Sequence, residues 1–260
     1  MDGISVFFPC YGDAGTIPSM VIRAIQTLRT LTDDYEVIVI NDASPDDAAD
    51  VLRELETAYP RELRVITHSV NRDYGGVLRS GFAAAAKPLI FYTDGDAQYD
   101  PRELTLLVDA LRPDVDIVNG YKIDRGDPLI RIVIGRIYHW GMKAAFGFKI
   151  RDVDCDFRLI RREVFDVLDL TLTSGAITVE FVTKATDLGF RFAEVPVHHY
   201  HRAAGKSQFF NFPRIFRTLR NLTRLWWTLR IRRTHLKRDT TRGASAAIPV
   251  TVPVEQPTND

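Results

Sequence analysis

Two carboxylates stand two residues apart where an apolar run ends, in residues 91–98, which read FYTDGDAQ. On an extended segment residues i and i+2 point the same way, so Asp94 and Asp96 can converge on one cation, and Gln98 is next on that face. An acidic turn after a strand is the alternative interpretation. Mg²⁺ and Mn²⁺ prefer oxygen ligands and keep positions open that phosphate oxygens can fill. The pattern therefore indicates a divalent-metal site for phosphate chemistry.

The elements that must position this pair are predicted to be alternating strands and helices. Between helical segments, hydrophobic periodicity predicts strands near residues 4–9, 36–41, 63–68, 88–93 and 116–120. Residues 37–40 are continuously apolar, which is typical of strands covered on both faces. The sequence therefore predicts an α/β fold with a mostly parallel central sheet.

Polar side chains gather where four of these strands end. They are Tyr11 and Asp13, Asn41 and Asp42, residues 71–76, and Asp94 with Asp96. Ligands of parallel sheets bind at the carboxyl ends of the strands. We therefore expect the four strand ends to form one site.

The composition fits a catalytic domain with a sizeable core and an uneven charge distribution. The 260 residues are 45% hydrophobic, and 34 basic side chains balance 34 acidic ones. Residues 1–130 hold 12 Lys plus Arg and 22 Asp plus Glu, and residues 131–260 hold the reverse. A basic C-terminal half suits an anionic partner, which can be a membrane surface, a phosphate or a nucleic acid.

Cysteine usage and hydropathy indicate the compartment. Cys10 and Cys155 are the only cysteines and form no CxxC pair, so we expect a reduced setting without a disulfide framework. The sequence shows no signal-type segment at its start and no uninterrupted run of about 18 apolar residues. We therefore expect a peripheral protein on the cytoplasmic face of a membrane, without a transmembrane helix.

Four motifs occur in order along the chain: Pro9-x-Tyr11, residues 39–46 (VINDASPD), residues 71–81 (NRDYGGVLRSG) and residues 94–98 (DGDAQ). Over residues 4–207 the chain resembles family 2 inverting glycosyltransferases of the dolichyl-phosphate mannose synthase and bacterial polyprenyl-phosphate type. The resemblance implies a GT-A nucleotide-sugar (Rossmann-like) fold and a Mg²⁺ or Mn²⁺ cofactor. No G-x-G-x-x-G fingerprint occurs, which disfavours a dinucleotide oxidoreductase.

The resemblance implies roles for the side chains of these motifs. It places the nucleotide sugar and the metal on Pro9, Tyr11, Asp13, Asp42, Asp94, Asp96 and Gln98. Asp42 can accept hydrogen bonds from the N–H groups of uracil or guanine, so UDP and GDP both stay open. Capping of a helix that begins near residue 45 is the other role for this region. Arg79, beyond the glycine pair of the third motif, could reach the nucleotide.

The chain departs from the family pattern at two places near the base. It has Gly12-Asp13 where the family usually has Asn-Glu or a similar pair, and Asn41 where the family has Asp. Asp42 matches the more important carboxylate, so we expect nucleotide binding to be kept.

A second acidic cluster, residues 151–158 (RDVDCDFR), lies in the acceptor half. In the resembling family this loop closes over the active site and its Arg end lies near the acceptor phosphate, which implies catalytic roles for Asp156 and Arg158. Some bacterial members have an Asp at this position that is proposed as a base. A phosphate monoester is already anionic at neutral pH, so Asp156 can instead orient Arg158 or the sugar hydroxyls.

Residues 199–207 resemble the family's Arg-x-x-Gly-x-Ser segment, which is thought to close over the diphosphate. Arg202, Lys206 and Ser207 could neutralise charge that develops on the leaving group. We expect ordinary hydrogen-bonding roles for the neighbouring histidines.

Residues 209–239 predict a basic amphipathic helix. Its apolar stripe holds Ile215, Phe216, Leu219, Leu222, Trp226 and Leu229, and its polar stripe holds Arg214, Arg217, Asn221 and Arg224. Such a helix is typical of an anionic membrane interface, and a helix packed on the domain is the alternative. A nucleic-acid-binding arm would not need the apolar stripe, so we expect no nucleic acid. Residues 129–148 predict a second amphipathic helix. Together the two helices could form a cradle for a lipid phosphate, with Arg131 as a residue that binds the acceptor phosphate.

These patterns predict a catalytic domain in residues 1–208, which includes the 129–148 helix, an interfacial helix region in 209–239 and a disordered tail in 240–260. We predict metal-dependent inverting transfer of one sugar from a nucleotide sugar to a polyprenyl phosphate, at an anionic membrane surface where a membrane protein can be a partner. One alternative is transfer to a glycan or small-molecule hydroxyl with Asp156 as base. The other is a non-catalytic nucleotide-sugar-binding module that recruits partners to membranes.

Overall fold

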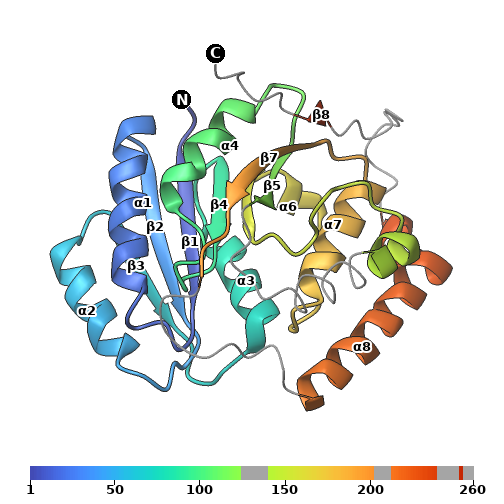
Figure 1. The fold of residues 1–260 in the computed structure, drawn as a ribbon, viewed down its shortest axis with the longest axis horizontal. Coiled ribbons are helices and arrows are strands. Elements are labelled where there is room, and N and C mark those ends of the chain that lie inside the picture. The colour runs from blue at the N-terminus through green and yellow to red at the C-terminus, as the bar shows by residue number, and fades with distance from the viewer. Residues whose placement is uncertain (124–139, 202–211, 239–251, 254–260) are drawn as a thin grey trace.

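The computed structural model describes residues 1–123, 140–201, 212–238 and 252–253 of the chain (Figure 1). Its first half contains β1 (Ile4–Cys10), α1 (Ile17–Leu31), β2 (Tyr35–Asn41), α2 (Ala48–Ala58), β3 (Leu63–Thr67), α3 (Asp73–Ala84), β4 (Leu89–Thr93), η1 (Pro101–Glu103), α4 (Leu104–Ala110) and β5 (Ile117–Ile123). Its second half contains β6 (Phe157–Arg161), α6 (Val164–Val167), α7 (Ile177–Asp187), β7 (Phe192–His198), α8 (Phe212–Trp226), η2 (Trp227–Arg232), η3 (Thr234–Arg238) and β8 (Val252–Pro253). Residues 140–146 are also helical. The five predicted strands are confirmed, with each end within three residues of its predicted position.

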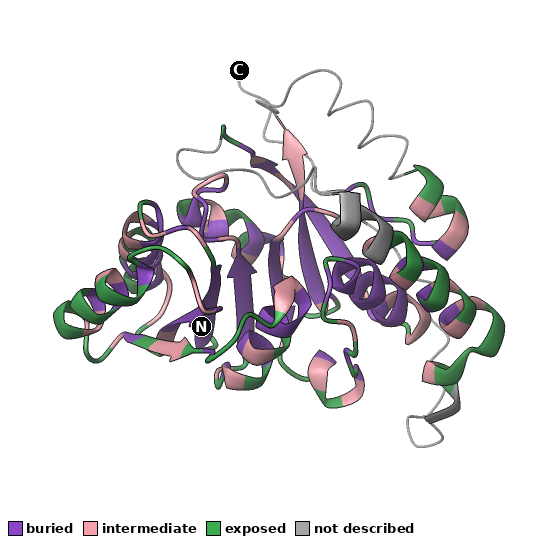
Figure 2. Cartoon of the chain, turned by 90° about the horizontal axis from the view of Figure 1, so that it is seen from below, coloured by how far each residue is buried: buried purple, intermediate pink, exposed green. Residues whose placement is uncertain are grey.

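The sheet has the strand order β3-β2-β1-β4-β6-β5-β7-β8. β6 runs antiparallel to both of its neighbours, β4 and β5, and the other pairings are parallel. The prediction of a mostly parallel central sheet is therefore confirmed. Helices cover both faces, so the strands are buried on each side while the outer sides of the helices are exposed (Figure 2).

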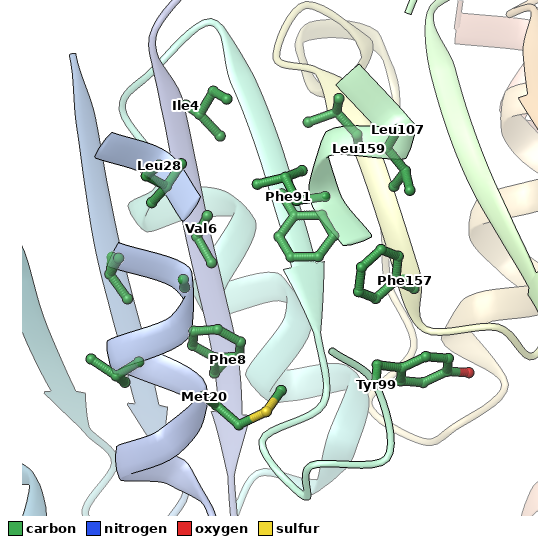
Figure 3. Packing of buried hydrophobic residues seen from close by; sticks show 14 of the residues in the cluster. Ile4, Val6, Phe8, Met20, Leu28, Phe91, Tyr99, Leu107, Phe157 and Leu159 are labelled. Carbon is green, nitrogen blue, oxygen red and sulfur yellow. The ribbon is translucent and has the colours of Figure 1, made fainter. Parts of the chain in front are cut away.

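The core has two halves because successive residues of a strand point to opposite faces of the sheet. On one face Val6 and Phe8 of β1 pack against Met20 and Leu28 of α1 (Figure 3). On the other face Phe7 stacks on Tyr92 of β4 with ring centroids 5.4 Å apart. This second half also takes in residues of α3, α6, α7 and α8.

The C-terminal helical region packs on this second half. Leu222, Leu225 and Leu229 are buried, and Trp226 Nε1 donates a hydrogen bond of 3.0 Å to the carbonyl of Ala145. Leu219 is 53% exposed. The predicted apolar stripe is therefore divided: Leu222, Trp226 and Leu229 face the domain rather than a membrane, because the helix lies against residues 140–146 and α7.

Several predicted segments fall outside the described residues or overlap their limits. Residues 129–139 of the second predicted amphipathic helix, including Arg131, lie outside them, and so does most of the predicted 240–260 tail. Within that tail Val252–Pro253 pairs with β7. The domain boundaries stay predictions. Among the described residues, no helix combines the length and the hydropathy needed to cross a membrane.

Candidate active site

Four parallel strands end at the same edge of the sheet. In register, Cys10 at the end of β1 pairs with Asn41 at the end of β2, and Asn41 pairs with Thr67 at the end of β3. β4 pairs with β1 on the opposite side. The loops that follow these strands therefore start side by side, and the side chains described below come from them.

Asp42 follows β2 and is nearly fully buried. Its Oδ1 lies 2.6 Å from Nδ1 of His68 and accepts a hydrogen bond of 2.8 Å from the backbone N–H of Arg72. Its carbonyl oxygen accepts a hydrogen bond of 3.3 Å from Nδ2 of Asn71. The carboxylate is thus tied to the start of α3. It does not cap α2: the N-cap residue Asp47 makes no side-chain cap hydrogen bond, and the N–H of Ala48 donates to the carboxylate of Asp46 at 3.3 Å.

The loop after β1 lies beside Asp42. Pro9, the second-last residue of this strand, pairs with Ile40, and Tyr11 is 42% exposed. Asp13 is buried, and its Oδ2 accepts a hydrogen bond of 3.3 Å from the Tyr11 N–H. An exposed aromatic ring next to a buried carboxylate is an arrangement that can hold a base and a ribose.

The loop after β4 holds the carboxylate pair. Asp94 Oδ1 accepts a hydrogen bond of 2.9 Å from the hydroxyl of Tyr74, and Asp96 Oδ1 accepts one of 3.0 Å from the Gln98 N–H. A Cβ on Gly95 would lie 2.7 Å from the carbonyl oxygen of Pro9, so only glycine lets this loop approach β1 so closely. The pair is thereby fixed next to the end of β1.

Electrostatics in this loop favour a cation. Burial raises the pKa of Asp94 well above its usual value, and the charges of Asp156 and Asp96 raise it further. A bound divalent cation would stabilise the ionised carboxylates, and oxygen donors suit Mg²⁺ or Mn²⁺. The described residues contain no group of three acidic, His or Cys side chains placed to hold a metal. A cation held by Asp94 and Asp96 would take phosphate oxygens or water as its other ligands.

Gln98 makes a different contact from the predicted one. Its Nε2 donates a hydrogen bond of 3.2 Å to the carbonyl of Tyr200, and the Tyr200 N–H donates one of 2.8 Å to the Gln98 carbonyl. These two bonds tie the loop after β4 to the segment after β7. A role for Gln98 as a metal ligand stays a prediction.

Asp156 lies close enough to Asp94 for its charge to raise the pKa of that residue, and Arg158 lies beside Asp156. Arg158 is fully buried, and its Nε donates a hydrogen bond of 2.5 Å to Oδ1 of Asn119. Its other nitrogens bond to the hydroxyl of Tyr92 and to the carbonyl of Val153. The Arg158 guanidinium lies 3.8 Å from Asp156, and the Tyr92 hydroxyl lies 3.5 Å from the same carboxylate. Protein groups engage the guanidinium, so its predicted contact with an acceptor phosphate stays a prediction.

Burial also affects the carboxyl groups of residues 151–158. Burial raises the pKa of Asp156, although the positive charge of Arg158 opposes the shift. Burial raises the pKa of Asp154 to about 7. Lys122 Nζ donates a hydrogen bond of 2.7 Å to the Asp154 carbonyl and brings a positive charge to the cluster. Carboxyl groups whose pKa values are raised by burial cluster at functional sites.

Arg79, the described one of the remaining predicted residues, is an exposed residue of α3, and its predicted contact with the nucleotide stays a prediction. Arg131, Arg202, Lys206 and Ser207 lie outside the described residues.

Sequence reasoning missed His68, Tyr74, Tyr92 and Asn119. His68 follows directly after β3, and Tyr74 lies within the third motif, where only the glycines were interpreted. Their positions at a strand end and a helix start were the signals that could have identified these two.

The chain matches known proteins over the part that carries this site. Residues 5–169 match the family described as Glycosyl transferase family 2. Undecaprenyl-phosphate 4-deoxy-4-formamido-L-arabinose transferases from Yersinia enterocolitica and Aeromonas hydrophila are each 27% identical over 208 residues. That region is 79% of this chain and 62% of each relative, so the chain spans less than two thirds of their length.

Solved structures share the fold. Glucosyl-3-phosphoglycerate synthase from Mycobacterium tuberculosis in complex with phosphoglyceric acid superposes with a TM-score of 0.65 at 17% identity, over 87% of this chain and 79% of that chain. A mannosyltransferase from Pyrobaculum calidifontis in complex with GDP-Man and Mn²⁺ gives a TM-score of 0.65 at 20% identity, over 89% and 64%. The predicted GT-A fold is confirmed.

Proposed function

Since the chain belongs to glycosyl transferase family 2, we propose that it transfers one sugar from a nucleotide-diphosphate sugar to a polyprenyl phosphate, with inversion and with Mg²⁺ or Mn²⁺ as cofactor. One observation carries the proposal. Asp42, the pair Asp94 and Asp96, and Asp156 lie in adjacent loops at one edge of the sheet, within the part that matches the family.

Each group has a task in this reaction. Asp42 offers its carboxylate to the N–H groups of the base. Asp94 and Asp96 would hold the cation, whose positive charge would stabilise the diphosphate leaving group. The Tyr74 hydroxyl, 2.9 Å from Asp94, orients that carboxylate toward the site. Displacement at the anomeric carbon by an acceptor from the opposite side inverts its configuration.

The acceptor is proposed from the relatives and from the position of Asp156. The relatives are undecaprenyl-phosphate transferases by name. A phosphate acceptor arrives ionised, so Asp156 and Arg158 need only fix the position of the attacking oxygen. Asp156 also lies where it could deprotonate a hydroxyl, and its raised pKa suits a base. Transfer to a glycan or small-molecule hydroxyl is therefore the second candidate.

We propose that the C-terminal helices hold the enzyme at an anionic membrane surface on the cytoplasmic side. Trp227 and Ile231 of η2 are 51% and 52% exposed, like Leu219 of α8. Arg220, Arg224 and Arg232 are exposed in the same stretch. Apolar side chains beside arginines favour binding at the headgroup region of a bilayer. The lipid acceptor would be reached from this surface.

The deciding assay follows radiolabel from a panel of UDP- and GDP-sugars into polyprenyl phosphate, dephosphorylated polyprenol and soluble glycans, with and without Mn²⁺. We expect label in polyprenyl phosphate, only with the metal and only from one or a few donors. Label that enters polyprenol or glycan but never polyprenyl phosphate would favour the hydroxyl acceptor. Nucleotide-sugar binding without any transfer would favour a non-catalytic module.

A further inference from the structure

His68 is the closest side-chain partner of Asp42, the carboxylate proposed to bind the base. Its Nδ1 lies 2.6 Å from Asp42 Oδ1, and its Nε2 lies 2.9 Å from the hydroxyl of Ser80. His68 is 5% exposed and Asp42 is 2% exposed. A carboxylate oxygen only accepts hydrogen bonds, so Nδ1 carries the proton of this contact. The imidazole therefore holds the carboxylate in one orientation, and Ser80 on α3 fixes the ring.

The two oxygens of Asp42 are used unequally. Oδ1 accepts from His68 Nδ1 and from the Arg72 N–H, which fills the two lone pairs of that oxygen. Within the described part of the chain, no hydrogen bond reaches Oδ2. One carboxylate oxygen is thus taken by the protein, and one is left for a ligand.

Nucleotide bases differ in how many donors they present to such a group. Uracil has one ring N–H, which lies between two carbonyl groups. Guanine presents a ring N–H and an amino group side by side, and this pair of donors matches both oxygens of a carboxylate. With Oδ1 filled, guanine would leave one donor without a partner, and sites discriminate strongly against ligands with unpaired polar groups.

We propose that His68 is a positioning residue that leaves Asp42 a single accepting oxygen, and that it thereby selects uracil over guanine in the donor nucleotide. The proposal rests on the proposed function, because it assumes that the base lies at Asp42. Tyr11, 42% exposed on the neighbouring strand end, offers a face for the same base.

Two substitutions of His68 separate positioning from packing. In His68→Asn the amide nitrogen takes the place of Nδ1 and keeps the donor to Asp42. In His68→Gln the amide lies near the place of Nε2, so it keeps a polar group at Ser80 and loses the donor to Asp42. The full-length chain and both variants are titrated with UDP and with GDP by calorimetry in the presence of Mn²⁺, and their thermal melts are compared.

The wild type should bind UDP more tightly than GDP. His68→Gln should lose about 10- to 100-fold in UDP affinity, the range for a hydrogen bond to a charged group, and its preference for UDP should shrink. His68→Asn should stay within a few fold of the wild type. GDP binding as tight as UDP binding in the wild type, or equal UDP affinity in the wild type and in a folded His68→Gln, would overturn the inference.

Asp42→Asn distinguishes this failure from that of the proposed function. If Asp42→Asn weakens UDP binding while His68→Gln does not, the base lies at Asp42 and only the role of His68 is wrong. If Asp42→Asn binds UDP like the wild type, or if no nucleotide binds to the wild type, the assignment of the donor site itself is wrong.

Discussion

Asp94 and Asp96 are the residues on which the proposed chemistry depends most directly. We expect Asp94→Asn or Asp96→Asn to lower turnover by at least about 100-fold, because each removes an anionic ligand from the cation that stabilises the leaving group. Thermal stability should be kept, since neither side chain lies in the apolar core. Turnover and Mn²⁺ titration of purified protein give the readout.

Asp50→Asn is the matched control, since its carboxylate is 71% exposed and pairs with Arg53 one helical turn away. It should act like the wild type. Wild-type turnover in the Asp94/Asp96 double variant, or in excess EDTA, would contradict the metal mechanism.

Asp156 separates a phosphate acceptor from a hydroxyl acceptor. With polyprenyl phosphate as acceptor, Asp156→Asn should keep measurable activity, because the nucleophile is already ionised. With a hydroxyl acceptor the loss should reach about 10²- to 10⁴-fold, the usual contribution of a general base. Single-turnover rates of the wild type and the variant on the preferred acceptor distinguish the two. Glu163→Gln, an exposed carboxylate just beyond β6, is the control.

Asp154 should make stability depend on pH. Burial raises its pKa in the folded protein to about 7 from a usual value near 3.8, so the folded state holds a proton that the unfolded state releases. The stability penalty from this carboxyl therefore grows as pH rises from about 4 to about 7 and is constant above that. Asp154→Asn lacks the penalty and keeps the backbone contacts to Asp152 and Lys122.

The stability gained by Asp154→Asn over the wild type should be larger at pH 8 than at pH 5.5 by about 2 kcal/mol. Chemical denaturation at the two pH values measures the difference. Asp114→Asn, with a 54% exposed carboxylate, should show no such trend. An equal gain for Asp154→Asn at both pH values would show that the carboxyl ionises freely in the folded protein.

At the scale of single residues, the sequence identified the carboxylates but not the side chains that hold them. Asp42, Asp94 and Asp96 could be predicted because a strand end and a short motif fix their positions. His68 contacts Asp42 across 26 positions of the sequence, and Tyr92 contacts Asp156 across 64. Such pairings depend on the order of strands in the sheet, which local patterns do not reveal.

At the scale of elements, the start of α3 is held by the loop before α7. The Gly75 N–H donates a hydrogen bond of 2.7 Å to the carbonyl of Thr173, and a Cβ on Gly75 would lie 2.6 Å from the carbonyl oxygen of Leu172. The buried carboxylate of Glu180 accepts hydrogen bonds from Thr171 and Leu172 and so fixes this loop. α3 in turn supplies Tyr74 to Asp94.

Gly75→Ala should therefore destabilise the protein by about 1 to 3 kcal/mol, the usual cost of overpacking, although alanine normally favours a helix. It should also weaken nucleotide and metal binding, because α3 must shift. Gly175→Ala is a matched control in the same loop, since nothing lies within 4 Å of a Cβ there. Thermal melts and UDP titration of both variants test this. Equal thermal stabilities of the two variants would show that the loop before α7 can shift with no loss of stability.

The elements that could be predicted are those with a continuous apolar pattern. β1, β2 and β4 contain such runs, and β3 and β5 follow the same alternation of strands and helices, so all five positions were predicted correctly. β6 was interpreted only as part of an acceptor loop, because the buried Arg158 and the partly buried Arg161 interrupt its apolar pattern. The hydrogen bonds that allow Arg158 to be buried come from β4, β5 and the preceding loop, so the strand is recognisable only in the folded sheet.

At the scale of the whole molecule, membrane binding should depend on the outer side of the C-terminal helices. The double substitution Trp227→Glu with Ile231→Glu should reduce flotation with anionic vesicles, because it removes about half-exposed apolar groups and adds negative charge. Wild-type binding should weaken as salt increases. The melting temperature should not change, since both side chains point away from the core.

Leu106→Glu is the matched control for this prediction. Leu106 is 41% exposed on α4, which lies far from α8 in the molecule (Figure 1). It should float like the wild type. Equal flotation of the double variant and the wild type would show that η2 does not contribute to membrane binding.

The sequence predicted a basic amphipathic helix here, but not which of its sides would be covered. Leu222 and Leu229 on one side and Leu219 and Ile231 on the other are chemically alike. The packing of residues 140–146 and α7 decides between them, and Arg230, which pairs with Asp187 of α7 at 2.9 Å, fixes the choice.

The place of β7 means that the stretch of sequence common to the family is shorter than the unit that folds. The family match ends at residue 169, yet β7 pairs along the whole of β5, which lies inside the match. A fragment cut at residue 169 would leave β5 as an open edge and bare the apolar face that α7 and α8 cover. Open edges and bare apolar faces promote aggregation. Truncated proteins and domain fusions should therefore keep the chain at least through η2, even where the purpose is only to study nucleotide binding.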